Sequence, residues 1–280
     1  MKTILVTVIF VTCLSGKLRA QQPLPENYLS IPVLITLENG SSGSGFFISS
    51  SNHFFLATAG HVLFDKKSRK LQCNQANVSW HVDAGTNHSK SEFHMLLDVL
   101  EKDNNIRLHP THDVAIVRLG AMTPARRFVW NTNEVQLVSE DIMPAMVSNT
   151  ELRKLQNVVV GDEVYVFGYP SSIGLTQLPQ FDYSRPLLRK GIISGIYDKA
   201  QTIVIDASVN FGNSGGPVSE KQEVSLGVQS FTVIGVVSEL IPFVDIWENK
   251  RYEYTNVNVS NSGYAVVEPV DFIIELLWDN

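Results

Sequence analysis

Short apolar runs, rich in β-branched and aromatic residues, alternate with turn-forming residues along most of this chain. In the first half, four such runs predict strands at residues 31–37, 45–48, 54–58 and 114–119. The segment Ser49–His53 predicts a hairpin loop between the second and third of them. Residues 66–108 are more polar and predict an irregular stretch with weaker strands inside it.

The strand rhythm fades between residues 120 and 156, where polar residues mix with three apolar patches. We interpret this stretch as the connection between two halves. A second set of strands is predicted at residues 158–160, 163–167, 190–197, 202–205, 232–237 and 264–267. Pro269 predicts the start of a helix that ends near Trp278, because proline suits a first helical turn. Two β-rich halves and a closing helix indicate an all-β protein of paired antiparallel barrels.

The first twenty residues form a separate unit. Lys2 provides a positive start, residues 3–14 are nearly all apolar, and residues 15–20 form a short polar exit. The apolar stretch is too short for a membrane-spanning helix, which needs about 20 residues. We therefore predict a secretory signal peptide cleaved after Ala20, and a mature chain of residues 21–280 that is secreted or periplasmic.

Charge and cysteine content narrow the possible partners. Removing the first twenty residues takes away three basic and no acidic residues, which moves the formal charge from −6 to −9. Such an acidic chain argues against nucleic acid and against anionic lipid as partners. Cys13 lies in the predicted leader, so Cys73 is left alone and no internal disulfide is expected. Stability must then come from the core, which suits a bacterial exported protein.

Three short segments far apart in the chain carry the candidate chemistry: residues 58–61 with His61, residues 112–116 with Asp113, and residues 212–217 with Ser214. A serine hydroxyl is a weak nucleophile that needs an imidazole to take its proton and a carboxylate to orient that imidazole. The order His, Asp, Ser is one of the few that bring such groups together on a known scaffold. The three segments together predict acyl transfer by an activated serine.

The glycines around Ser214 suit the oxyanion that such a reaction forms. Glycine on both sides allows a tight turn that can aim the backbone N–H groups of Gly212 and Ser214 at one point. The same glycines keep side chains out of the path of a substrate.

These segments resemble the signatures of chymotrypsin-fold serine endopeptidases, and most closely those of the bacterial trypsin-like and Deg/HtrA-type branch. The resemblance runs from about residue 30 to residue 275 and rests on residues 43–46, 56–62, 112–117, 206–217, 234–236 and 262–265. It implies two antiparallel six-stranded β-barrels and a C-terminal α-helix, with an N-terminal barrel at about 30–120, a linker at 121–156, and a C-terminal barrel and helix at 157–280. It also implies His61 as general base and then acid, Asp113 as its orienter, and Ser214 as nucleophile.

Departures from the family pattern are informative. The Deg/HtrA enzymes usually carry a PDZ module after the protease, and none is expected here. Digestive relatives have an aspartate just before the nucleophile that pairs with a newly cut N-terminus. Asn213 stands at that position and cannot form this ion pair, so we expect no internal activation cut.

By the same resemblance, specificity is expected to favour a small to medium uncharged residue before the scissile bond. Trypsin reads basic side chains with an aspartate six positions before the serine, and Ser208 stands at that position here. The histidine of glutamate-preferring relatives is also missing, since all seven histidines lie at or before His112. The expected pocket walls are Ser208, Val209, Asn210, Phe211, Val236, Val237, Ser238, Tyr264, Ala265 and Val266.

Other interpretations remain open. The segment from His109 to Asp113 could hold a metal, but on a strand its two histidines would point to opposite faces, so we expect no metal site. No cofactor motif is present, and none is implied. An esterase would share the triad, but α/β-hydrolases have the chain order Ser, Asp, His. A protease-fold binding protein, such as an adhesin or a host-factor ligand with little turnover, is the main alternative to an endopeptidase acting on proteins or peptides.

Overall fold

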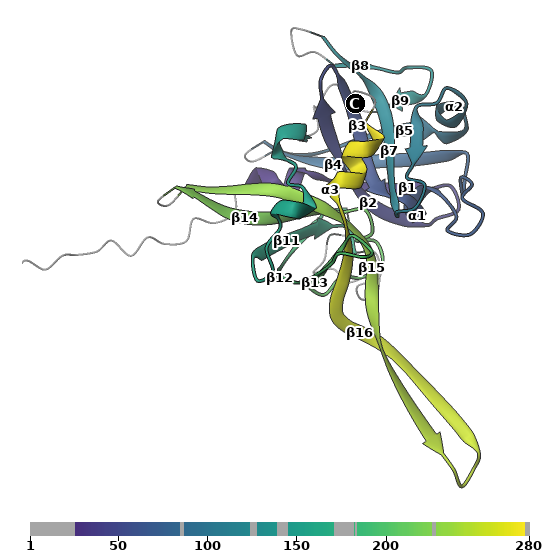
Figure 1. Cartoon of the computed structure of the whole chain (residues 1–280). Helices are drawn as coiled ribbons and strands as arrows, with labels where there is room; N and C mark the ends of the chain where they lie inside the picture. Colours follow the sequence, from purple (N-terminus) through teal and green to yellow (C-terminus); the bar gives the residue numbers. More distant parts are fainter. Residues whose placement is uncertain are drawn as a thin grey trace, which may run out of the picture.

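The computed structural model describes residues 26–84, 87–123, 128–138, 145–170, 182, 184–225 and 228–277. The predicted leader, with Cys13, lies outside these residues, as do Trp278 and the whole of residues 171–181. The described residues form two antiparallel sheets and a short C-terminal helix, which confirms the mostly β fold expected from the sequence (Figure 1).

The first sheet contains ten strands in the order β6-β7-β3-β2-β1-β4-β5-β9, with β8 beside β7 and β10 beside β2. Its long strands are β1 (Pro32–Leu37), β2 (Ser42–Ser50), β3 (His53–Ala59), β4 (Gln75–Ala84), β5 (Asn87–Leu96) and β7 (Val114–Met122). Its four short strands are β6 (Ile106–Leu108), β8 (Phe128–Trp130), β9 (Val135–Leu137) and β10 (Met146–Ser148). Among the described residues the two end strands, β6 and β9, do not pair with each other. The curled sheet is therefore a half-barrel and not a closed barrel.

The number of strands in this sheet differs from the expected six. The six long strands match that number, but four strands of three residues each are added. Three of these, β8, β9 and β10, are the apolar patches of the stretch interpreted as a connection. A three-residue run carries too little of its own periodicity to be recognised, because its pairing is decided by the neighbouring strand. The polar stretch of residues 66–108 likewise contains the two ten-residue strands β4 and β5 rather than weak strands.

The second sheet is a closed barrel of six strands, as expected, in the order β11-β12-β13-β16-β15-β14. The strands are β11 (Glu163–Gly168), β12 (Leu187–Tyr197), β13 (Thr202–Asp206), β14 (Pro217–Ser225), β15 (Val228–Asn249) and β16 (Tyr254–Pro269). The strand expected at residues 158–160 is wrong. Val159 and Val160 are more than half exposed there, and Gly161 turns the chain at φ +96° just before β11.

Helices are short. They are α1 (Gly60–Leu63), α2 (Leu97–Lys102) and α3 (Val270–Leu276), with 3-10 turns η1 (Glu26–Ser30), η2 (Asn149–Glu151) and η3 (Leu155–Asn157). The helix α3 confirms the predicted closing helix, and Pro269 is its N-cap residue rather than part of its first turn.

Three buried clusters explain the unbroken apolar runs in the sequence. Alternate residues of a strand face opposite sides of its sheet, so Phe47 and Phe54 enter the core of the first sheet, while Phe46 and Phe55 face a second cluster. That second cluster also contains Val233 and Val236 of β15 and the apolar side of α3. The helix therefore packs at the junction of the two sheets, where it is visible in Figure 1. The third cluster fills the closed barrel.

A long arm leaves the closed barrel (Figure 1). It is the outer part of the hairpin of β15 and β16, from Pro242 to Asn261. Val244 lies opposite Val259 and Ile246 opposite Val257, so these four aliphatic residues share one face, and about half or more of each is exposed. The sequence pattern predicted only the inner ends of both strands, because Asn, Ser and Asp interrupt the apolar rhythm of the arm.

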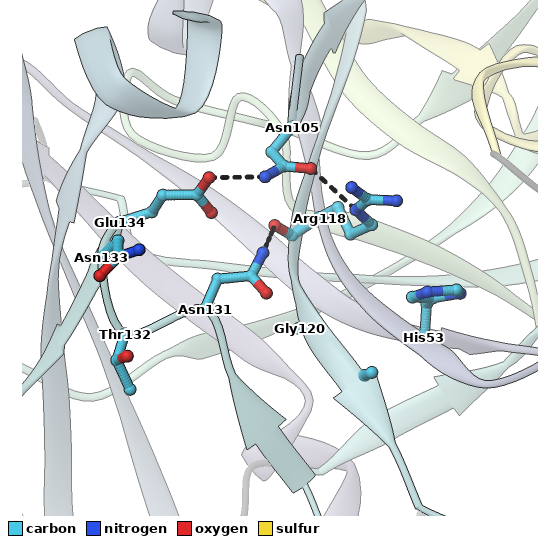
Figure 2. Close-up of a pocket in the computed structure, with 9 residues that line it drawn as sticks. His53, Asn105, Arg118, Gly120, Asn131, Thr132, Asn133 and Glu134 are labelled. Atoms are coloured by element: carbon cyan, nitrogen blue, oxygen red, sulfur yellow. Dashed lines mark hydrogen bonds between the residues drawn. The ribbon is translucent and has the colours of Figure 1, made fainter. Parts of the chain in front are cut away.

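A polar network fixes the edge of the first sheet (Figure 2). The Nδ2 of Asn105 donates to Oε1 of the buried Glu134 at 2.6 Å, and the Nε of Arg118 donates to Oδ1 of Asn105 at 2.8 Å. Asn131 donates to the carbonyl of Arg118 at 3.2 Å. The side-chain amide of Asn105 thus links the carboxylate of Glu134 to the guanidinium of Arg118. All three residues line a cavity of about 310 Å³.

A second buried carboxylate lies in the closed barrel. The side chain of Glu220 on β14 is 0% exposed and forms a 3.1 Å ion pair with Nε of Arg153. Burial is the largest cause that raises the pKa of Glu220, to about 7, and Asp162 raises it further while Arg153 opposes the shift. The folded protein therefore binds a proton at Glu220 more tightly than the unfolded chain does.

We expect Glu220→Gln to remove one part of the pH dependence of stability. Because the folded pKa exceeds the ordinary value of 4.5, Glu220 lowers the free energy of unfolding as pH rises from about 4.5 to above 7, by up to about 3 kcal/mol. Urea unfolding at pH 5, 6, 7 and 8 measures this. The variant should gain on the wild type as pH rises, whereas Glu38→Gln, at an exposed carboxylate, should follow the wild type. Parallel curves for wild type and Glu220→Gln would contradict the expectation.

Candidate active site

His61 and Asp113 are held together by side chain and backbone. Nδ1 of His61 donates to Oδ2 of Asp113 at 2.6 Å, and the backbone N–H of His61 donates to Oδ1 at 2.8 Å. The N–H of Gly60 donates to the carbonyl of Asp113 at 3.0 Å. Ala59, the N-cap of α1, has no capping side chain. Asp113 thus caps the helix that carries the imidazole. In the part of the chain that the structure describes, Nε2 of His61 has no hydrogen-bond partner.

Gly60 is required for this close approach. A methyl group added there would lie 2.6 Å from Leu108 Cδ1 and 3.1 Å from Oδ1 of Asp113. The glycine in the segment Thr58–His61 therefore has a packing reason that the sequence alone did not reveal.

Ser238 adds a third hydrogen bond to Asp113. Its hydroxyl donates to Oδ2 at 2.7 Å. Ser238 was expected in a pocket wall. Its contact with Asp113 was not predicted, because no pattern in the sequence relates residue 238 to residue 113. Burial alone would raise the pKa of Asp113, but the hydrogen bonds from His61 and Ser238 together with the charge of His61 hold that pKa below its usual value. The carboxylate is therefore ionised at neutral pH.

The turn that contains Ser214 docks directly on the first sheet. The N–H of Ser44, on β2, donates to the carbonyl of Ser214 at 2.7 Å, and the hydroxyl of Ser44 donates to the carbonyl of Gly212 at 2.7 Å. Gly215 has φ +83°, and a methyl group there would lie 2.2 Å from the carbonyl oxygen of Ser44. No side chain fits at that position, so glycine is needed both for its φ and for the contact.

Ser214 lies next to the helix of His61. A methyl group added at Gly43 would touch both Val62, at 2.6 Å, and the carbonyl oxygen of Ser214, at 3.1 Å. Gly43 therefore lies between the backbone of Ser214 and the side chain of Val62, the residue that follows His61. Among the described residues no hydrogen bond joins the Ser214 hydroxyl to the His61 ring, and in enzymes without substrate this bond is often long.

The backbone around Ser214 leaves two N–H groups free. Gly212 has φ +95°, and no described residue accepts a hydrogen bond from the N–H of Gly212 or of Ser214. The amide of the buried Asn213 holds the turn from within, because its Oδ1 accepts from the N–H of Asn210 at 3.0 Å. A neutral hydrogen bond thus stabilises the turn at the position where digestive relatives use an ion pair.

The expected pocket residues lie in different surroundings. Val209, Val237 and Ala265 pack in the core of the closed barrel, and Val236 packs in the cluster beneath α3. Phe211 and Tyr264 are exposed, and Ser208, Asn210 and Val266 are partly buried. A cavity of about 370 Å³ reaches His61 and Asp113, and of the expected pocket residues it is lined by Ser238 and Val266.

His109 and His112 do not diverge as predicted for a strand. The segment bends, so that the backbone N–H of His112 donates to Nδ1 of His109 at 3.0 Å, and the two rings lie 5.1 Å apart. Each ring is instead paired with a carboxylate: His109 with Glu275 at 3.1 Å and His112 with Glu268 at 2.9 Å. Within the described part of the chain, no group of three or more potential metal ligands is found.

Comparison with known proteins defines the class. A model of the trypsin-like peptidase domain matches residues 43–228, so the chain belongs to this family of serine peptidases. Among solved structures, Deg5 aligns at 19% identity and a TM-score of 0.48, covering 89% of this chain and 88% of Deg5. The thermostable serine protease AL20, from an extremophilic microorganism, aligns at 14% identity and 0.48, covering 88% of this chain and 93% of AL20.

A further solved structure matches this chain over only part of its own length, and no relative is found among curated sequences. The HtrA-type protease AlgW, solved with a tripeptide, aligns at 17% identity and a TM-score of 0.45, covering 90% of this chain but only 62% of AlgW. No curated protein sequence matches this chain significantly. Across the described residues, no helix combines the length and apolar character needed to cross a bilayer.

We expect Ser238→Ala to destabilise the protein at neutral pH and not in strong acid. The lost bond goes to a charged acceptor, so the free energy of unfolding should fall by about 1.5–3 kcal/mol. Since the folded pKa of Asp113 is lowered, the stability that Asp113 contributes is present above its ordinary value and disappears as pH falls through the folded value. Denaturant unfolding at several pH values measures this.

The matched control is Ser262→Ala, which removes a hydroxyl that donates to the carbonyl of Ile241 and has no contact with Asp113. Its effect should not depend on pH. If Ser238→Ala showed the same pH-independent loss, the bond to Asp113 would not be the cause.

Proposed function

We propose that this chain is a serine endopeptidase that hydrolyses peptide bonds through an acyl-enzyme on Ser214. The observation that carries the proposal is the 2.6 Å hydrogen bond between His61 and Asp113, beside the glycine-flanked turn of Ser214. Membership of the trypsin-like peptidase family supports the same chemistry. The substrates are proteins or peptides, and the mechanism uses only side chains, backbone N–H groups and water.

In the first half of the reaction, the Ser214 hydroxyl attacks the substrate carbonyl carbon as Nε2 of His61 takes its proton. Asp113 accepts the Nδ1 proton in a hydrogen bond, which fixes the tautomer and stabilises the imidazolium. The N–H groups of Gly212 and Ser214 receive the oxyanion. His61 then gives the proton to the leaving amine, and the C–N bond breaks to form an ester on Ser214.

In the second half, water replaces the amine. His61 takes a proton from water, whose oxygen attacks the ester carbonyl, and the same two N–H groups receive the second oxyanion. The proton returns to Ser214 as the C–O bond breaks, which releases a carboxylic acid and restores the site. A secreted or periplasmic location, after removal of the leader at Ala20, would give such an enzyme extracellular or envelope substrates.

We expect Ser214→Ala to lower turnover by about a millionfold while the fold is retained. The wild-type chain should react with a fluorophosphonate probe at one serine, identified by mass spectrometry, and Ser214→Ala should not. Ser184→Ala, which changes a partly buried serine hydrogen-bonded to Asp182, should label like the wild type. A folded wild-type chain that fails to label would favour a protease-fold binding protein.

We also expect a preference for small to medium uncharged residues before the scissile bond. Ser208 offers no charge at the position where trypsin reads basic residues, and the contacts of a pocket discriminate by only about 1–3 kcal/mol per methylene. Cleavage of a peptide library by residues 21–280 measures this. A profile dominated by arginine, lysine or glutamate would overturn the assignment.

A further inference from the structure

A second pair of imidazole and carboxylate lies directly behind Asp113. Nδ1 of His112, the residue before Asp113, donates to Oε2 of Glu268 at 2.9 Å. The side chain of Glu268 is 9% exposed and that of His112 is 17% exposed. Both belong to the cavity that reaches His61 and Asp113. The proposed triad needs neither residue, so this buried pair has no role in the mechanism described above.

The fold holds this pair rigidly. The ring of His112 stacks on Phe272 of α3, with centroids 3.4 Å apart and an angle of 14° between the rings. Glu268 lies on β16 opposite Val236 of β15, and Ser238 follows two residues later on β15. Adjacent strands of the closed barrel therefore bring two polar groups, Ser238 and Glu268, to the segment of residues 112 and 113.

We infer that Glu268 is a positioning residue, which fixes Asp113 through His112 and adds negative charge behind the His61–Asp113 pair. This inference rests on the proposed function and extends its machinery beyond the three side chains of the triad. A carboxylate behind Asp113 favours the imidazolium that His61 becomes in each half of the reaction.

The electrostatics agree with this geometry. Burial raises the pKa of Glu268, the hydrogen bond and charge of His112 oppose the rise, and the charge of Asp113 adds to it. The backbone N–H of Asp113 stabilises the ionised form of the same carboxylate. The two carboxylates thus affect each other, and by reciprocity the charge of Glu268 acts on the site that contains His61.

The other charged groups around the cavity are Asp65, Lys66, Arg69 and Glu239. Lys66 pairs with Glu239 at 3.7 Å, with both side chains more than half exposed, and a guanidinium nitrogen of Arg69 donates to the carbonyl of His109. Solvent screens these exposed charges more than the buried one. Apart from Asp113 itself, Glu268 is therefore the charge around this cavity whose removal should be felt most strongly at His61.

The test compares Glu268→Gln with Glu275→Gln. Both change a carboxylate that pairs with a histidine of the same segment, but Glu275 pairs with His109 and does not line the cavity. In Glu268→Gln, we expect the acid limb of the pH profile of kcat/KM to move down by about 0.5–1 pH unit. We also expect kcat to fall about three- to tenfold while KM stays within about twofold. Glu275→Gln should follow the wild-type profile.

Equal effects of the two variants, or no shift in Glu268→Gln, would overturn the inference. If these carboxylates only held the segment of His109 and His112 in place, the two substitutions would have similar effects. If Glu268→Gln does not fold, His112→Leu and His112→Gln replace it. Leucine can pack on Phe272 but cannot donate to Glu268, whereas glutamine can donate. A kcat lower in His112→Leu than in His112→Gln supports the inference, and equal values overturn it.

The inference and the proposed function can fail separately. The titration midpoint of the His61 imidazole, followed by NMR in wild type and Glu268→Gln, does not require turnover. A downward shift in a chain that no fluorophosphonate labels would support the inference and overturn the endopeptidase. An unchanged midpoint in a chain that labels at Ser214 would do the reverse.

Discussion

The contact between Ser44 and the nucleophile turn is the interaction on which the active-site geometry depends. Ser44 is fully buried on β2 and forms four hydrogen bonds: to Gly212 and Ser214 in the closed barrel, from the N–H of Tyr169, and from the hydroxyl of Thr58. A buried hydroxyl must be satisfied in this way to be tolerated in a core. Because Thr58 precedes His61 by three residues, this one serine couples the turn of Ser214 to the strand that delivers the imidazole.

Asp113 is also fixed by contacts between the two halves of the chain, but here side chains of the second half hold a residue of the first. His61 lies on α1, directly after β3 of the first sheet, whereas Ser238 and Glu268 belong to β15 and β16. The helix α3 packs against the ring of His112. The two halves of the chain therefore meet through backbone and buried polar contacts as well as through the apolar cluster beneath α3. Such contacts depend steeply on distance and angle, so they fix the relative position of the halves more sharply than apolar packing alone.

The sequence was most informative where local pattern decides structure. Unbroken runs such as Phe54–Ala57 lie on strands buried on both faces, and β-branched runs predicted β7, β11 and β13 within a few residues. The outer arm was missed because Asn, Ser and Asp break its rhythm while its backbone pairing continues. The proximity of His61 and Asp113 could be inferred from motif order. The contacts of Ser44, Ser238 and Glu268 could not, because each joins residues more than 120 positions apart, and only the tertiary fold brings them together.

The residues of the candidate site differ in how much freedom the fold leaves them. Asp113 accepts three hydrogen bonds through its two oxygens, and His61 is tied at its ring and at its backbone N–H. The turn of Ser214 is fixed by its carbonyl and by glycines that admit no side chain. What remains is rotation about one bond of Ser214, because a serine side chain has a single χ1 angle with three staggered positions. Rotation about χ1 is therefore the movement that the fixed turn leaves to the Ser214 hydroxyl.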